Sequence, residues 1–309
     1  SVLPEVGKES VTQLQVEACR TLVAIGAEGT PEIEARLVDL TALPRVAIRA
    51  AALGAIASLA ALAQDEAPRQ MEALSRPPAR GAWQAETDWR RRRLAAARRC
   101  LALARRMGLH CLDVPGDVIQ DAAIRCLARS RMPLPNAATA AEREADEQDR
   151  QTLIETLRRF LQQSDSATLH ASVAGAFGEL GGPAAGRALS DLLRRRSYAE
   201  DPSTQRDEYQ VLQAAIAAFG VLAAHGTEAD GPQAFEELLQ LLADSRELLG
   251  GARRPAGGHV RMQDLALEQI QQVTGLRDPQ ANPEVWRERY QSLMKKRNAV
   301  GSEADHDKP

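Results

Sequence analysis

A four-column hydrophobic pattern recurs six times along this chain, and it constrains the fold more than any other feature. Within each copy the columns follow one another at intervals of four, four and three residues, which places them on one stripe of an α-helix. Most neighbouring copies begin 34 to 51 residues apart, so the sequence predicts a stacked array of helical repeats. The second column consists of small residues, namely Ala18, Ala52, Ala123, Val173, Ala215 and Ala266. The first, third and fourth columns are Leu14, Ile48, Ile119, Leu169, Val211 and Met262; Leu22, Ile56, Leu127, Phe177, Phe219 and Ile270; and Ile25, Leu59, Ser130, Leu180, Leu222 and Val273.

Composition agrees with this pattern. Hydrophobic residues make up 44% of the chain, but aromatic residues only 3%, so Ala and Leu supply most of the apolar content. These two residues are strong helix formers, and β-branched residues never alternate with polar ones over a useful length. The predicted fold is all-α, a right-handed solenoid of about six or seven helical hairpins.

The segment 167–196 is the best-formed hairpin, since Gly181-Gly182-Pro183 can end one helix and open the next. Phe177 and Phe219 occupy the same column in successive units, and we expect both to be buried. The long Arg-rich helix expected at 88–107 is either a displaced second helix of the pair that begins at Pro44 or a degenerate repeat. Further pairs are expected at 13–25 with 31–40, 44–62 with 66–74, and 260–274 with 283–294.

These units form one predicted domain, 1–296, which is irregular at about 76–116. An Ala-, Pro- and acid-rich insertion is expected at 133–148, and a shorter one at 245–258. The polar residues 297–309 are expected to form a flexible tail.

The run from Val173 to Leu193, VAGAFGELGGPAAGRALSDLL, resembles HEAT repeats in the bacterial form related to those of phycobilisome lyases. The segment Val273–Pro279, followed by Pro283-Glu-Val-Trp286, is similar to a terminal unit found after many bacterial HEAT arrays. The resemblance implies an α-solenoid that binds other macromolecules, and it implies no particular reaction, because this fold hosts many functions.

Arginine is concentrated in one predicted helix. Between Arg76 and Arg131 there are 13 basic and 5 acidic residues, a local charge of +8 in a chain whose net charge is −3. A seven-residue spacing aligns two rows, which are Arg91, Arg98 and Arg105, and Arg92, Arg99 and Arg106. These rows could bind an acidic protein, or phosphates of nucleic acid or lipid. They could also be a solvated face, partly neutralised by the acidic residues Glu142, Glu144, Asp146, Glu147 and Asp149.

Trp83 and Trp89 flank the Arg rows and could stack on bases. Because the few aromatic residues are scattered, they do not predict the aromatic-lined cleft of a HEAT-like DNA glycosylase. We expect Trp83 and Trp89 to cover the gap left by the irregular unit, and Trp286 to cover the last hydrophobic layer.

The sequence predicts no catalytic, cofactor or metal site. The five His residues lack partners at metal-ligand spacing, and no nucleophile elbow or phosphate loop occurs. Cys19, Cys100, Cys111 and Cys126 are expected to be buried free thiols, although one disulfide among the last three stays open. The sequence contains no run of 18 apolar residues, so it predicts no transmembrane segment. The chain begins with Ser1 and not Met, which is compatible with a processed, exported or lipid-anchored form or a cytoplasmic one.

The sequence thus favours a non-catalytic scaffold that binds another protein, within a larger assembly. The alternative is electrostatic binding of nucleic acid or phosphate through the Arg-rich helix.

Overall fold

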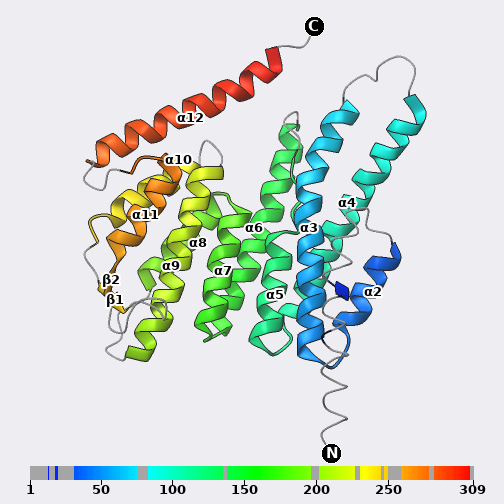
Figure 1. Cartoon of the computed structure of the whole chain (residues 1–309), viewed down its shortest axis with the longest axis horizontal. Coiled ribbons are helices and arrows are strands. Elements are labelled where there is room, and N and C mark those ends of the chain that lie inside the picture. The colour runs from blue at the N-terminus through cyan, green and yellow to red at the C-terminus, as the bar shows by residue number, and fades with distance from the viewer. Residues whose placement is uncertain are drawn as a thin grey trace, which may run out of the picture. The chain divides into compact units, whose positions relative to one another are not determined.

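The computed structural model describes residues 13, 18–19, 31–75, 83–134, 138–195, 202–226, 230–244, 247–249, 259–277 and 282–306. This part of the chain contains eleven numbered helices and one two-stranded sheet (Figure 1), which confirms the predicted all-α class. The helices are α2 (Pro31–Thr41), α3 (Val46–Ser75), α4 (Trp83–Leu112), α5 (Asp117–Ala128), α6 (Ala140–Gln163), α7 (Ala167–Leu180), α8 (Pro183–Arg195), α9 (Pro202–His225), α10 (Asp230–Leu241), α11 (Met262–Thr274) and α12 (Pro283–His306). Most of the helix predicted at 13–25 lies outside the described residues, but Gln13, Ala18 and Cys19 are helical.

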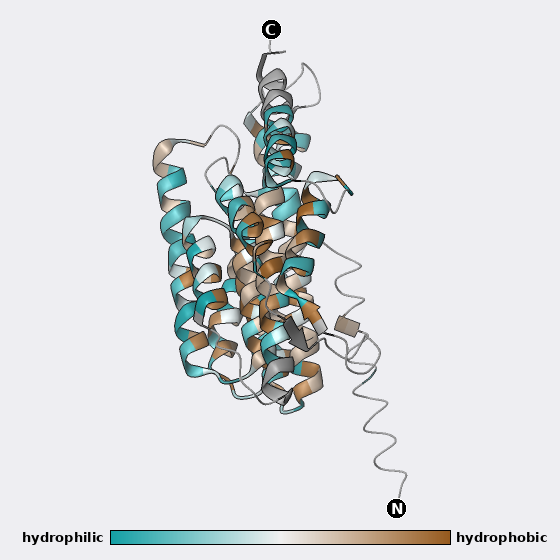
Figure 2. Cartoon of the chain, turned by 90° about the vertical axis from the view of Figure 1, so that its left-hand side faces the viewer, coloured by the Kyte–Doolittle hydropathy of each residue, from teal (hydrophilic) through white to brown (hydrophobic). Residues whose placement is uncertain are grey.

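The hydrophobic columns form the core, as the sequence predicts. Figure 2 shows hydrophobic residues concentrated where helices pack together and hydrophilic residues along their outward sides. From the second copy onward, every residue of the first three columns is buried, from Ile48, Ala52 and Ile56 to Met262, Ala266 and Ile270. In the fourth column Val273 is only half-buried. Ser130 lies beyond the end of α5, where its hydroxyl donates to the Leu127 carbonyl over 2.8 Å.

The chain divides into two compact units, Ser1–Ala176 and Phe177–Pro309, with the boundary inside α7. In the first unit α3 packs against α2, α4 and α5, and its contact with α4 is the most extensive. Helix α4 therefore occupies the place of a second helix beside α3, as one of the two sequence interpretations expected. The hairpin predicted at 44–62 and 66–74 is wrong, because α3 runs unbroken through Pro68. Ala67 before Pro68 and Gln70 after it are both buried, which favours the continuous helix despite the backbone hydrogen bond that Pro68 cannot donate.

Helix α3 is also the one helix in the described part of the chain that is long and apolar enough to cross a membrane, by length and composition only. Half of its apolar window is buried within the protein. A core helix meets the same criterion, and α3 has helices on several sides.

The insertion expected at 133–148 is only partly irregular, because α6 begins at Ala140. A capping box starts this helix: the Glu142 amide donates to the Thr139 hydroxyl, and the Thr139 amide donates to the Glu142 carboxylate over 2.7 Å. The acidic residues of the insertion are therefore held on a helix. The inner side of α6 buries Leu153, Ile154, Leu157 and Phe160.

In the second unit α9 packs against α8, α10 and α11. Phe177 and Phe219 are 0% and 1% exposed, which confirms the prediction that both are buried. The turn before α8 is also confirmed, since Gly181 and Gly182 adopt φ values of 70° and 88°, a region that strains residues with a Cβ.

Two segments of this unit contain more regular structure than the sequence analysis expected. The insertion at 245–258 contributes to a short antiparallel hairpin, β1 (Glu247–Leu249) with β2 (His259–Arg261), in which Leu248 pairs with Val260. The polar segment expected as a tail from residue 297 is helical as far as His306. At the start of that segment Arg297 donates to the Ala224 carbonyl over 2.9 Å, which attaches α12 to the end of α9.

Candidate binding face on helix α4

Helix α4 is amphipathic, and its inner side is anchored in the first unit. Leu94, Ala97, Leu101, Ala104 and Met107 are all buried, as the helical pattern predicts. Near its end, a Cβ on Gly108 would lie 2.7 Å from the Leu127 side chain of α5, so glycine permits this close approach. The packing fixes which side of α4 faces outward, and the Arg rows lie on that outer side.

Three arginines on this helix are held by carboxylates from other helices. Arg93 pairs with Glu66 of α3 over 3.3 Å, and Arg99 pairs with Glu34 of α2 over 3.2 Å. Arg105 pairs with Asp149 of α6. The acidic insertion therefore neutralises part of the Arg-rich face, and among the described residues it does so through the Arg105–Asp149 pair. Asp146 instead bridges Arg131 and Arg150 over 2.8 and 2.9 Å.

Two further arginines pair within α4 itself. Arg90 contacts Glu86 over 2.6 Å, and Arg91 contacts Asp88 over 3.7 Å. The Arg91 pair is well exposed, with 70% and 55% of the two side chains accessible. Exposed pairs of this kind contribute little free energy, roughly 0–1 kcal/mol, so Arg91 can exchange its partner at small cost.

Arg92, Arg98 and Arg106 are exposed. Among the described residues no carboxylate lies within ion-pairing distance of them. Together with Arg91 they leave cationic groups on both rows of α4. The structure thus separates the predicted set into guanidinium groups fixed by the fold and guanidinium groups that face solvent.

A seam of small and apolar residues lies between the two rows. Ala95, Ala102 and Leu109 are spaced by seven residues, and all three are exposed, Leu109 to 41%. These three residues did not stand out in the sequence, because single alanines on a helix surface are common. Their signal was the same seven-residue interval that aligns the arginines on either side.

The structure describes the side chain of one of the two tryptophans that flank the Arg rows. The side chain of Trp83 lies outside the described residues. Trp89 lies at the surface with 41% exposure, and the expectation that it covers the gap left by the irregular unit stays a prediction. The guanidinium carbon of Arg93 lies 4.8 Å from the centre of the Trp89 ring, a cation–π contact that occupies one ring face. Trp286, by contrast, is fully buried in α12, as expected.

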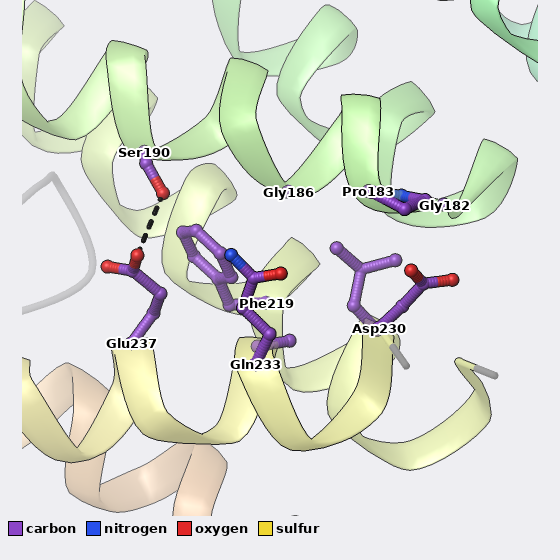
Figure 3. A pocket seen from close by; sticks show the side chains of 10 residues that line it. Gly182, Pro183, Gly186, Ser190, Phe219, Asp230, Gln233 and Glu237 are labelled. Atoms are coloured by element: carbon purple, nitrogen blue, oxygen red, sulfur yellow. Dashed lines mark hydrogen bonds between the residues drawn. The ribbon is translucent and has the colours of Figure 1, made fainter. Parts of the chain in front are cut away.

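A groove lies between α8 and α10 in the second unit, and Figure 3 shows the residues that line its narrow part. Its wider part, about 270 Å³, is lined by Leu193, Arg194, Gln240 and Asp244, with Ser190 and Glu237 shared with the narrow part. The Ser190 hydroxyl donates to the Glu237 carboxylate over 3.2 Å. The narrow part, beside Asp230, holds about 10 Å³, which is room for about one water molecule. The groove offers polar groups along an open surface without an enclosed space for a substrate.

The cysteines lie in the core. All four are free, which answers the open question of a disulfide, and all are buried. Burial raises the pKa of Cys100 to about 11 and that of Cys126 to about 12. The Cys126 thiol donates to the Leu53 carbonyl over 3.2 Å. Since the thiolate is the nucleophilic and metal-binding form, these protonated thiols are unreactive at neutral pH.

Within the ranges that the structure covers, no group of three or more His, Cys, Asp or Glu side chains converges as metal ligands would.

No protein-family model, curated protein or solved structure matches the chain.

Proposed function

We propose that this chain is a non-catalytic interaction scaffold, an α-solenoid of HEAT-like helical hairpins that binds an acidic partner protein through the outer face of α4. The observation that carries the proposal is the exposure of Arg92, Arg98 and Arg106 without a carboxylate from the described residues. The neighbouring Arg93, Arg99 and Arg105 are tied to other helices, so the face is held rigid while its free cations point outward.

The packing of α4 supports this use. Its inner side is buried against α3 and α5, so the outer side is presented on a fixed core and not on a mobile loop. Complementary charge at such a face increases the association rate and excludes basic partners. Because ion pairs already order Arg93, Arg99 and Arg105, these side chains lose less conformational entropy when a partner binds.

A charge-reversal experiment tests the proposal. The variant carries Arg92→Glu, Arg98→Glu and Arg106→Glu, and the matched control carries Arg159→Glu, Arg187→Glu and Arg194→Glu, at exposed arginines of α6 and α8. Crosslinking and affinity purification of the wild type should yield an acidic protein whose crosslinks map to α4. The α4 variant should lose that protein and the control should keep it. Retention by both variants would overturn the proposal.

Arg105 is left unchanged in this design because reversing it would place a second negative charge beside Asp149 and break the ion pair between α4 and α6. Circular dichroism and thermal melting should be nearly the same for both triple variants, since surface substitutions usually change stability by less than about 0.5 kcal/mol each.

Nucleic-acid binding is the alternative that the same face allows. Each phosphate contact contributes a slope of about −0.9 to the dependence of log K on log salt, so three free guanidinium groups predict a slope near −2.7. Duplex DNA titrated at several salt concentrations measures it. Tight DNA binding with that slope, lost in the α4 variant, would favour the alternative over the protein scaffold.

A further inference from the structure

The outer face of α4 consists of a central apolar seam with a row of arginines on each side. The seam of Ala95, Ala102 and Leu109 runs along its middle, and one row of arginines follows each edge. Arg92 and Arg106 stand on one edge and Arg98 on the other. We call this surface the α4 seam face. From Ala95 to Leu109 it is about 21 Å long, at 1.5 Å per residue.

The seven-residue interval determines which kind of chain fits this face. Small residues in a line let a second helix approach closely, toward the lower end of the 8–10 Å range of helix–helix distances. In helix pairs of this type, charged residues that flank an apolar row select the partner by opposite charge. An extended peptide repeats every two residues and cannot keep its side chains in register with all three positions of the seam.

We propose that the α4 seam face binds an amphipathic helix of a partner protein, whose apolar row packs on Ala95, Ala102 and Leu109 and whose flanking Asp or Glu residues pair with Arg92, Arg98 and Arg106. This inference rests on the proposed scaffold function and specifies its partner. Charge complementarity selects the occupant, because cations with no carboxylate partner in the described part of the chain flank the seam on both sides. A basic or neutral helix would leave them unpaired in a desolvated contact, which is unfavourable.

The seam also distinguishes a helix from a phosphate backbone. Nucleic acid would use the arginines and gain nothing from a central row of methyl groups. A partner helix buries that row, and Leu109 in particular loses an exposed apolar surface. The size of the residue at position 102 should therefore affect helix binding strongly and phosphate binding weakly.

The experiment uses the full chain and synthetic peptides about three heptads long. The first peptide has Leu and Ala in an i, i+7 row with Glu on both flanks, and a side-chain staple keeps it helical. The second contains the same residues in an order that scatters Leu and Glu around the helix. The third replaces each Glu with Lys. Binding is measured by fluorescence anisotropy at low and physiological salt.

We expect the first peptide to bind at least roughly tenfold more tightly than the second, and the third not to bind. Ala102→Gln should weaken the first peptide by roughly tenfold, since extra side-chain volume at a packed contact is costly. Ala141→Gln, at an exposed alanine of α6, is the matched control and should leave affinity unchanged. The triple reversal at Arg92, Arg98 and Arg106 should abolish binding.

The outcomes separate the two proposals. If the first two peptides bind equally tightly and both need the three arginines, the proposal of an acidic partner stands and the proposal of a partner helix is rejected. Unchanged affinity in Ala102→Gln also rejects the seam. If the triple reversal binds every peptide as the wild type does, or if only duplex DNA binds, the scaffold function of this face fails together with the helix.

Discussion

The ring of Tyr290 in α12 stacks on the ring of Phe235 in α10, with the ring centres 4.1 Å apart and the planes inclined by 6°. The Tyr290 hydroxyl donates to the Ala223 carbonyl of α9 over 3.0 Å. One side chain therefore joins three helices of the second unit. Nearby, Arg287 makes a two-pronged contact with Glu236 over 2.8 and 3.0 Å, which fixes the same helix pair from the outside.

Replacing Tyr290 with Phe should destabilise the protein by about 0.5–1.5 kcal/mol at pH 7, because a buried hydrogen bond to the Ala223 carbonyl is lost. Burial raises the pKa of Tyr290 to about 12, above its ordinary value of 10. The protonated form is thus favoured by folding, and this contribution is complete below pH 10 and lost as the pH rises toward 12. Urea unfolding at pH 7 to 11.5 should show the gap between wild type and variant shrinking. A gap independent of pH would contradict the assignment.

Phe177→Ala and Phe219→Ala should each reduce the free energy of unfolding by about 3–5 kcal/mol, since each leaves a cavity in a fully buried site. Val221→Ala serves as the control on α9, because Val221 is 42% exposed and its loss should change stability by less than about 0.5 kcal/mol. Chemical denaturation measures all three. A Phe variant as stable as the control would show that the third column is not a packing column.

Gly231→Ala should destabilise the second unit, although alanine is the better helix former. A Cβ at this position would lie 2.7 Å from the Tyr290 hydroxyl, which its stacked ring and hydrogen bond hold in place. Adding Tyr290→Phe removes the clashing oxygen, so the double variant should lose less stability than the two single losses combined. Gly186→Ala, in α8, has open space around its Cβ and should gain about 0.5–1 kcal/mol. Additive losses in the double variant would argue against the clash.

The thiols should react slowly with an aromatic disulfide reagent at pH 8 in the folded protein. All four are buried, and those of Cys100 and Cys126 have pKa values of about 11 and 12. In denaturant all four should react rapidly and at a similar rate. Rapid reaction of even one thiol per folded protein molecule with the reagent would show an accessible thiolate. Mass spectrometry of the labelled peptides identifies which cysteine reacts.

Local sequence determined the helical elements and their buried stripes. The periodic placement of Ile, Leu, Phe and Ala fixes which side of a helix is apolar, and this depends only on the geometry of one helix. The turn Gly181-Gly182-Pro183 was predictable for the same reason, since positive φ values favour glycine within a single backbone segment. The start of α6 was not predicted, although its signal was local: Thr139 and Glu142, three residues apart, form a capping box within the segment expected as an insertion.

Tertiary packing determined the features that local sequence does not predict. Helix α3 continues through Pro68 because burial on both sides outweighs one missing hydrogen bond. The Arg rows of α4 were visible in the sequence, but Arg99 meets Glu34 and Arg105 meets Asp149 only because folding brings α2 and α6 beside α4. An ion pair requires atoms within a few ångströms, and chain segments this far apart reach that distance through tertiary contacts alone. The sequence therefore determined where the arginines lie on their helix, and the tertiary structure decided which of them face solvent with no carboxylate from the described chain.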